Sequence, residues 1–358
     1  MKIAIIGLAN SGKTTVFNAL TRGTAETAAY SSGQLEPNIA TVKVPDRRLD
    51  ELVRMFKPRK LTPTDVQYVD VAGMSGGNKS GLPPAVLNYI SGADAFLHVV
   101  RAFDDANVPH PDGSVDFRRD IEAVDLELTF SDLAIIEKRL VRLNGEIGKM
   151  AGREREQRTI ERDALVRLQA ALEAGQHVRD IDLSEDEARL LKGYQFLTAK
   201  PILQVINVSD SALSQTFALE YNHRMSGVAV IAGKIEAELA QMGDDDATLF
   251  MEDLGITEPA RNRVITMSYE LLGLMSFLTA GEDEVRAWTI RRNTPAVEAA
   301  GAIHSDIQRG FIRAEIVAFD DLIKAGGMVE AKKQGTVRLE GKQYIVKDGD
   351  ICHFLFNV

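Results

Sequence analysis

The sequence predicts an α/β fold with a largely parallel sheet, and three observations support that prediction. Short apolar runs rich in valine and isoleucine recur along the chain, each with the length of a buried strand. Helical patterns follow several of these runs, as they do where parallel strands alternate with helices. A glycine-rich loop joins the first run to the first helical pattern. The runs lie at 2–6, 66–72, 94–100, 201–208 and 227–232, and a further run at 40–46 is expected to form an edge strand beside 66–72.

Composition restricts the class of protein. The 358 residues predict two or three domains, and 45% hydrophobic with 26% charged residues excludes a globally disordered chain. The single cysteine, Cys352, excludes a disulfide framework and a multi-cysteine zinc site. No apolar run approaches the roughly 18 residues of a membrane-spanning helix, and the run at 2–6 is too short for a signal peptide. We therefore expect a soluble, cytoplasmic protein with no membrane partner.

The charge is unevenly distributed along the chain. The formal net charge of −10 argues against a protein that is basic throughout and binds nucleic acid over its whole surface. Residues 131–170 nevertheless carry nine basic and seven acidic side chains, and residues 284–358 carry eleven and ten. These neutral to mildly basic stretches leave room for a local anionic partner.

The first loop carries the clearest chemical motif. Residues 7–14 read GLANSGKT and match G-x-x-x-x-G-K-[ST], between the expected strand and a helical pattern. Glycines let backbone amides turn toward phosphate oxygens, and the helix N-terminus adds partial positive charge. Lys13 is expected to reach the β- and γ-phosphates as a catalytic cation, and the Thr14 hydroxyl to ligate Mg²⁺. The predicted nucleotide-binding residues of this loop are Asn10, Ser11, Gly12, Lys13, Thr14 and Thr15.

A second motif, Asp70-Val71-Ala72-Gly73, ends the run at 66–72. An acidic residue at this place can hold the hydration shell of Mg²⁺, and the amide of Gly73 can contact the γ-phosphate. We therefore predict Asp70 as a metal-binding residue and Gly73 as a nucleotide-binding residue.

Two later loops come in the order in which a GTPase domain carries its base-binding motifs. The segment 207–210 reads NVSD and lies where GTPases place Asn-Lys-x-Asp, whose carboxylate accepts two guanine N–H groups. The second residue here is valine, which removes the lysine that covers the base. The segment 232–234 reads AGK and lies where GTPases place Ser-Ala-Lys. The predicted base-binding residues are Asn207, Val208, Asp210, Ala232, Gly233 and Lys234.

Between 129 and 196 the pattern becomes helical. An apolar stripe with spacings of three and four runs from Leu133 to Met150, and it resumes after a charged stretch at 165–172. Ser184 and Glu187 fit a capping box for a further helix. This pattern predicts an inserted helical hairpin or short coiled coil, which either packs within the molecule or projects as an arm that binds a partner.

From about 281 onward, short strand-like runs alternate with glycine turns, which indicates a small α+β module. The complete prediction is a nucleotide-binding domain at 1–128 and 197–280, a helical insertion at 129–196, and a C-terminal module at 281–358.

Together these segments resemble the YchF/Obg-like ATPase family of P-loop proteins. The resemblance covers essentially the whole chain, and it is carried by GLANSGKTT, LEPNIATVKVPDRRLDEL, DVAG, ADAFLHVVRAFDD with NVPH, NVSD, KIEAELA, AWTIRRNTPAVEAAGAIHSDIQRGFIRAEI and GKQYIVKDGDICHFLFNV. It implies a P-loop GTPase-like domain with an inserted helical hairpin or coiled coil. It also implies that the C-terminal module is a TGS domain, which is an α+β, ubiquitin-like fold.

The resemblance implies an NTPase that hydrolyses ATP in preference to GTP with Mg²⁺ as cofactor. The family carries a hydrophobic residue in place of the water-positioning glutamine after Asp-x-x-Gly, and Met74 fits. His110 is then the implied catalytic group that orients the water, and a surface histidine beside two prolines is the alternative. Asn10 matches an asparagine that holds a monovalent cation in some potassium-dependent relatives, so K⁺ is a further candidate.

The sequence departs from the family pattern in three places. Gln34 stands where relatives carry a threonine that can reach the metal, and the second switch after Gly73 is about two residues shorter than usual. Asp210 stands where the family usually has glutamate and GTPases have aspartate. With Lys234 in the last loop, a preference for guanine stays open.

The prediction is therefore a monomeric, ribosome-associated regulatory NTPase that contacts ribosomal RNA, ribosomal protein or both, and that hydrolyses slowly without an activating partner. Two alternatives remain open. The altered switches favour a nucleotide-gated ribosome-binding adaptor whose hydrolysis is vestigial, and Asp210 favours a true GTPase.

Overall fold

The computed structural model describes residues 1–25, 37–71, 82–212, 215 and 217–357. The chain forms two compact units, one made of 1–41 with 67–271 and the other of 42–66 with 272–358. Gln34, Gly73 and Met74 lie outside the described residues, so the predictions that rest on them stay predictions. Within the described part of the chain, none of the helices combines the length and the apolar composition needed to cross a membrane.

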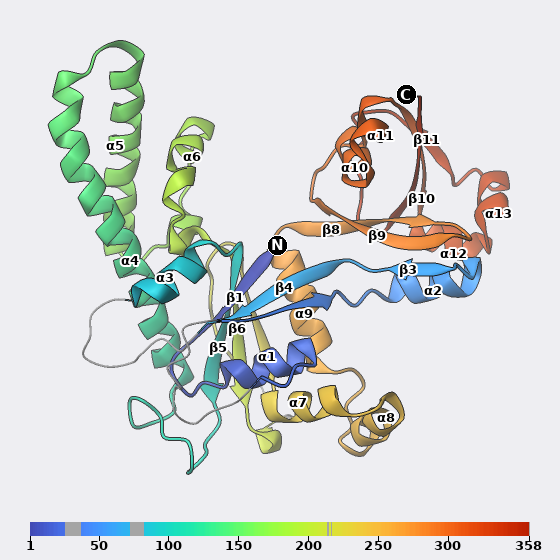
Figure 1. Ribbon diagram of the computed structural model, residues 1–358, viewed down its shortest axis with the longest axis horizontal. Coiled ribbons are helices and arrows are strands. Elements are labelled where there is room, and N and C mark those ends of the chain that lie inside the picture. Colours follow the sequence, from blue (N-terminus) through green and yellow to red (C-terminus); the bar gives the residue numbers. More distant parts are fainter. Residues whose placement is uncertain (26–36, 72–81, 213–214, 216, 358) are drawn as a thin grey trace. The chain divides into compact units, whose positions relative to one another are not determined.

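The sheet of the first unit is the predicted α/β sheet, with strand order β2-β4-β1-β5-β6-β7 (Figure 1). Its strands from β4 to β7 are parallel, and β2 is the edge strand beside β4, as expected. The strands are β1 (Lys2–Ile6), β2 (Asn38–Lys43), β4 (Asp65–Asp70), β5 (Ala95–Ala102), β6 (Ile202–Val208) and β7 (Ser226–Ile231). Every residue of β6 is buried, which explains why this strand appears in the sequence as an unbroken apolar run.

Helices cover this sheet and bury its apolar side chains. One core cluster joins Ile6, Val69 and Phe96 of the sheet to Val86 and Leu128 of two helices. Helix α1 packs against α7 and α9, which brings the first loop of the chain close to the last loops of the unit. The helices are α1 (Lys13–Thr21), α3 (Pro84–Ser91), α4 (Phe117–Glu146), α7 (Gly233–Gln241), α8 (Asp244–Asp253) and α9 (Ala260–Leu271).

The predicted helical hairpin is formed by α4 and α5 (Gly152–Glu173), which lie side by side in Figure 1 and are joined through a short 3₁₀ turn, η1 (Ile147–Lys149). The apolar stripe of the sequence forms its seam, where residues such as Leu140 and Leu143 pack against Leu165 and Leu168. The capping box of Ser184 and Glu187 begins α6 (Glu185–Leu191), as expected. Helix α4 runs without a break across the predicted domain boundary at 128.

The second unit has its own six-stranded sheet, with order β11-β10-β12-β8-β9-β3. It includes residues 42–66, which sequence analysis assigned to the nucleotide-binding domain, and it begins at Leu272 rather than 281. Short strand β3 pairs with β9, and Leu52 of helix α2 packs in the core of this unit with Val285. Only the tertiary pairing shows this association. The assignment to the TGS fold stays a prediction.

The elements of the second unit are α2 (Arg47–Phe56), β3 (Lys60–Thr62), β8 (Leu274–Ala280), β9 (Glu284–Arg291), α10 (Ala296–Ile303), α11 (Ser305–Arg309), β10 (Phe311–Ala318), α12 (Phe319–Ala325), α13 (Met328–Lys333), β11 (Arg338–Glu340) and β12 (Asp350–Phe356). Sequence analysis expected strand-like runs throughout this module, but residues 342–349 form turns, apart from an isolated bridge between Pro295 and Ile345, and strand β12 begins only at Asp350.

Candidate nucleotide-binding site

The loop between β1 and α1 requires its two glycines. Gly7 has φ +146°, and a Cβ there would lie 2.4 Å from the carbonyl oxygen of Val99. Gly12 has φ +90°, and a Cβ there would lie 2.3 Å from Nδ2 of Asn207. Asn10 also has a left-handed backbone, with φ +62°, a conformation that asparagine tolerates better than most residues. The chain therefore turns tightly here and enters α1 directly at Lys13.

Lys13 is a buried cation at the start of α1. Its side chain lies within the loop, the residue is 8% exposed, and Nζ donates a hydrogen bond to the carbonyl of Leu8 at 2.7 Å. Burial lowers the pKa of Lys13 to about 8, and the nearby carboxylate of Asp70 partly opposes that shift. A phosphate group beside Nζ would stabilise the charged form, because an anion next to a desolvated ammonium favours its protonation.

Thr14 and Asp70, the two residues that sequence analysis predicted to bind the metal, lie beside each other in the structure. The hydroxyl of Thr14 donates to Oδ2 of Asp70 at 2.9 Å. Burial raises the pKa of Asp70, while hydrogen bonds from Thr14 and Asn38 and the charge of Lys13 act in the opposite direction. The hydroxyl and carboxylate oxygens are the hard ligands that Mg²⁺ prefers, so the donor set fits this ion.

Asn207 connects the first loop to the loop that follows β7. Its Nδ2 donates to the carbonyl of Ser11 at 3.1 Å, and its Oδ1 accepts from the amide of Gly233 at 3.0 Å. Gly233 has no room for a side chain, since a Cβ there would lie 2.8 Å from Oδ1 of Asn207. The Asn207 amide therefore fixes the relative position of two loops, which follow β1 and β7.

The other predicted base-binding residues differ in exposure. Val208 is 3% exposed and packs in a core cluster with Ala232, so its side chain fills the interior. Asp210 begins a 3₁₀ turn after β6 and is exposed, and Lys234 is exposed in the first turn of α7. Lys234 and Thr15 line one cavity of about 590 Å³, together with Asn18, Ala237, Glu238, Gln241 and Met242.

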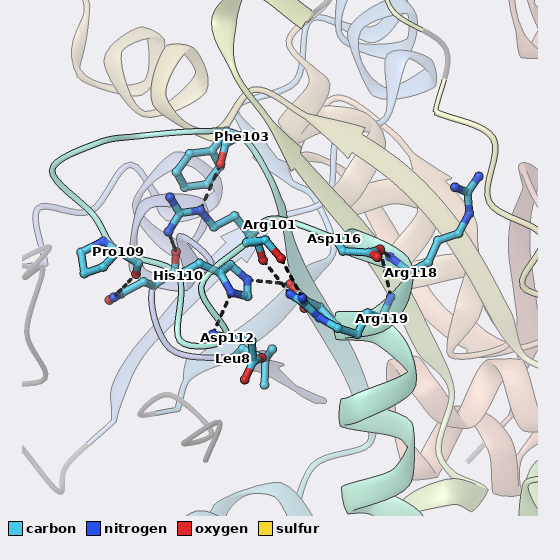
Figure 2. A network of polar contacts seen from close by, with 12 residues as sticks. Leu8, Arg101, Phe103, Pro109, His110, Asp112, Asp116, Arg118 and Arg119 are labelled. Carbon is cyan, nitrogen blue, oxygen red and sulfur yellow. Dashed lines mark hydrogen bonds and ion pairs between the residues drawn. The ribbon is translucent and has the colours of Figure 1, made fainter.

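Sequence analysis missed Arg101, which ends β5 and organises the loop after it (Figure 2). Its guanidinium donates to the carbonyls of Phe103 at 3.0 Å and Val108 at 2.8 Å, and more weakly to that of Asn10 at 3.4 Å. The side chain of Asn10 in turn donates to the carbonyl of Pro109 at 3.0 Å. The sequence signal was an arginine at the end of an apolar strand, which must find buried acceptors.

His110 is held in this loop by both ring nitrogens (Figure 2). Nδ1 accepts from the backbone amide of Asp112 at 3.1 Å, and Nε2 lies 2.8 Å from Oδ2 of Asp120 in the first turn of α4. Because Nδ1 accepts a hydrogen bond, Nε2 carries the proton of the neutral ring and donates a hydrogen bond to Asp120. The side chain is 4% exposed, and Arg119 binds the other oxygen of Asp120 at 2.8 Å. In this conformation the ring has no free nitrogen with which to take a proton from water.

This arrangement defines a class of protein. A phosphate loop leads from a central parallel strand into a helix, with a buried lysine and a threonine–aspartate pair beside it. These are the parts of a P-loop nucleotide-binding protein with a GTPase-type α/β domain.

Comparison with known proteins gives the family. The family model described as "50S ribosome-binding GTPase" matches residues 2–144. The model YchF-GTPase_C, described as "Protein of unknown function (DUF933)", matches residues 274–357. The chain is 43% identical to the "Ribosome-binding ATPase YchF" of Bacillus subtilis over 99% of this chain and 98% of that protein. It is 37% identical to "Obg-like ATPase 1" of Caenorhabditis elegans over 100% of this chain and 92% of that protein.

A solved structure agrees with these relatives. The YchF GTPase of Schizosaccharomyces pombe superposes with a TM-score of 0.84 at 31% identity, over 99% of this chain and 97% of that chain. The chain belongs to the YchF/Obg-like ATPase family, so the resemblance inferred from its motifs is confirmed.

Proposed function

We propose that this protein is a Mg²⁺-dependent P-loop NTPase that hydrolyses ATP and associates with the ribosome. The observation that carries the proposal is the convergence of Lys13, Thr14 and Asp70 at the end of the phosphate loop. The names of the bacterial relatives, which are ribosome-binding ATPases, support ATP as substrate and the ribosome as partner. A ribosomal partner in turn places the protein in the cytoplasm, and we expect a monomer.

Each residue at the loop has a distinct task in this proposal. Lys13 leaves its bond to Leu8 and neutralises charge on the β- and γ-phosphates, together with the loop amides up to Thr15. Thr14 and Asp70 hold Mg²⁺, which supplies Lewis-acid stabilisation of the phosphate oxygens when bound. Asn207 keeps the phosphate loop in register with the loop at Gly233, so base and phosphates are held at fixed separation. Contact between the amide of Gly73 and the γ-phosphate stays a prediction from the sequence, because Gly73 lies outside the described residues.

His110 orients or activates the attacking water, because Met74 cannot do so. The ring must first leave Asp120, which makes basal hydrolysis slow. The bond between Asn10 and Pro109 supports this role, since it joins the histidine loop to the phosphate loop. The same bond uses the Asn10 amide, and K⁺ binding at Asn10 would use its remaining carbonyl oxygen.

One observation favours the adaptor as a second candidate. Both ring nitrogens of His110 are occupied, so a protein that stays in this conformation would bind nucleotide without hydrolysing it. Single-turnover hydrolysis with and without purified ribosomes separates the two functions. Stimulation by ribosomes supports the NTPase, and an unmeasurable rate under both conditions supports the adaptor.

Calorimetric titration with Mg-ATP and Mg-GTP tests the substrate. We expect ATP to bind at least tenfold tighter, which corresponds to about 1.4 kcal/mol. Lys13→Ala is the control and should bind neither nucleotide well. Tighter binding of GTP that Asp210→Glu reverses would show that Asp210 reads guanine, and the protein would then be a GTPase. Parallel titrations in KCl and NaCl test the K⁺ site.

A further inference from the structure

Arg101 is a buried cation whose hydrogen-bond partners are backbone carbonyls. The residue lies in β5 and is 2% exposed. Its guanidinium donates to the carbonyls of Phe103 at 3.0 Å, Val108 at 2.8 Å and Asn10 at 3.4 Å. No carboxylate of the described residues forms an ion pair with it. Because these bonds neutralise no opposite charge, their effect is to hold three points of the backbone together.

The three carbonyls belong to two segments that are far apart in the sequence. Asn10 lies in the phosphate loop, whereas Phe103 and Val108 lie in residues 103–110, which we call the histidine loop. A guanidinium presents five N–H donors in one rigid plane, so it can bond several acceptors in different directions at once. A single side chain therefore ties the histidine loop to the phosphate loop.

Two further contacts join the same two loops. Nδ2 of Asn10 donates to the carbonyl of Pro109 at 3.0 Å. A Cβ built on Gly12 would lie 3.8 Å from Cε1 of Phe103, so the phenyl ring lies against the phosphate loop. The guanidinium of Arg101 lies over that ring, with its central carbon 4.6 Å from the ring centre (Figure 2). The histidine loop is therefore fixed to the phosphate loop near both of its ends.

This anchoring limits where the ring of His110 can go. The two residues before the histidine, Val108 and Pro109, accept hydrogen bonds from Arg101 and from the phosphate loop. The ring is bonded to Asp120 in the structure and must leave it to act on water. When the ring leaves, the anchored backbone keeps it at a defined distance from the phosphate loop. Hydrolysis depends steeply on that distance, because a displacement of about 1 Å can cost about 100-fold in rate.

We propose that Arg101 is a positioning residue for nucleotide hydrolysis. It sets the separation between the phosphate loop and His110 through the carbonyls of Asn10 and Val108, and it acts on the reaction only through the histidine. A movement of the phosphate loop on nucleotide binding therefore reaches the histidine loop through the shared guanidinium. The inference rests on the proposed NTPase function and on the role of His110 in it.

Arg101→Lys tests this role while keeping the positive charge. A lysine ammonium is a compact point charge and cannot span three carbonyls that surround a planar fork. Arg179→Lys is the matched control. Arg179 is 5% exposed and donates to the carbonyls of Thr198 at 3.2 Å and Lys200 at 3.0 Å, which belong to neither loop. Both variants lose buried hydrogen bonds of the same kind, so a general loss of stability would affect both.

Calorimetric binding of Mg-ATP and single-turnover hydrolysis at saturating Mg-ATP, with and without ribosomes, are measured for the three proteins. In Arg101→Lys we expect the rate to fall by about tenfold or more, while the dissociation constant changes by less than about threefold. Arg179→Lys should hydrolyse ATP at the wild-type rate. An unchanged rate in Arg101→Lys, or equal losses in both variants, would overturn the proposal. So would a loss of Mg-ATP affinity as large as the loss of rate, because Arg101 would then serve binding.

A double variant shows whether Arg101 acts through the histidine. His110→Ala removes the ring that Arg101 is proposed to position, so Arg101→Lys should cause no further loss of rate in that background. Losses that multiply would mean that Arg101 affects hydrolysis independently of His110, and the proposed role would be wrong.

A measurement without turnover separates this proposal from the NTPase function on which it rests. Histidine side chains labelled with ¹⁵N report the ring of His110 by NMR, and His110→Ala identifies its signal. Mg²⁺ with a non-hydrolysable ATP analogue should shift this signal in the wild-type protein and in Arg179→Lys, but not in Arg101→Lys. An equal shift in all three proteins, or no shift in the wild-type protein, would refute the positioning role. A wild-type protein that shows the shift but hydrolyses no ATP with or without ribosomes would instead refute the proposed NTPase function.

Discussion

Replacing Asp120 by asparagine should speed nucleotide hydrolysis, because the carboxylate holds His110 away from a catalytic position. In the structure Nε2 of His110 donates to Asp120 at 2.8 Å, and both side chains are nearly inaccessible to solvent. Asparagine has almost the same shape and keeps an oxygen acceptor, but it lacks the negative charge. The change therefore weakens the interaction without emptying the space.

The size of the effect follows from the two kinds of hydrogen bond. A bond to a charged group contributes about 1.5–3 kcal/mol net, and a neutral bond contributes about 0.5–1.5 kcal/mol. Asp120→Asn should therefore stabilise the released state of His110 by about 1–1.5 kcal/mol relative to the held state. If only the released state hydrolyses, the rate rises by about 5- to 12-fold.

Single-turnover hydrolysis of Mg-ATP without ribosomes measures this rate directly. Asp116→Asn is the matched control, since Asp116 caps the same helix by accepting from the amides of Arg118 and Arg119 and does not contact His110. Asparagine is an equally good cap, so the control rate should not change. In a His110→Ala background the gain should disappear. An unchanged rate in Asp120→Asn, or a gain that survives removal of His110, would refute the reasoning.

Three further predictions concern the phosphate loop, its lysine and the hairpin. Asn207→Ala leaves the Ser11 carbonyl and the Gly233 amide unsatisfied, and should lower the free energy of unfolding in urea by about 2–4 kcal/mol. The control Asn222→Ala, at an exposed position, should change it by less than about 0.5 kcal/mol. The affinity for Mg-ATP should be constant up to about pH 8 and fall above it, because Lys13 of the nucleotide-free protein then loses the proton that phosphate binding requires. Calorimetry from pH 6.5 to 9.5 tests this expectation, and an affinity that does not change with pH would contradict it. Burial alone would raise the pKa of Glu161, but hydrogen bonds from Arg139, Tyr194 and Arg158 outweigh it and lower the pKa to about 2. Ionised Glu161 therefore contributes stability that is present above the ordinary carboxyl range and is lost as pH falls toward 2. Acid unfolding monitored by circular dichroism should no longer show this pH-dependent loss of stability in Glu161→Gln.

Local patterns in the sequence predicted much of the fold. The apolar runs predicted the parallel sheet because buried strands leave a continuous signature in the sequence. The phosphate loop was recognisable because one short segment must supply the turn, the amides and the lysine together. The stripe from Leu133 to Met150 predicted the hairpin seam because its period of three and four matches a helix face.

The same reasoning missed part of the second unit. Residues 42–66 follow the phosphate loop in the chain and were assigned to the nucleotide-binding domain. The structure joins them to 272–358 through the pairing of β3 with β9 and the packing of α2. A three-residue strand has no distinctive local pattern, so its partner strand is decided by contacts with residues more than two hundred positions away.

The sequence by itself determined the family and the phosphate loop, since both depend on motifs whose residues lie close together in the chain. Only the tertiary structure showed that Asn207 joins two loops, that Arg101 orders the segment before His110, and that Asp120 holds the histidine. These contacts depend on which side chains meet when distant segments pack. The contacts form because buried polar groups need hydrogen-bond partners, and the spacing of residues within one segment does not indicate which partner from another segment they will find.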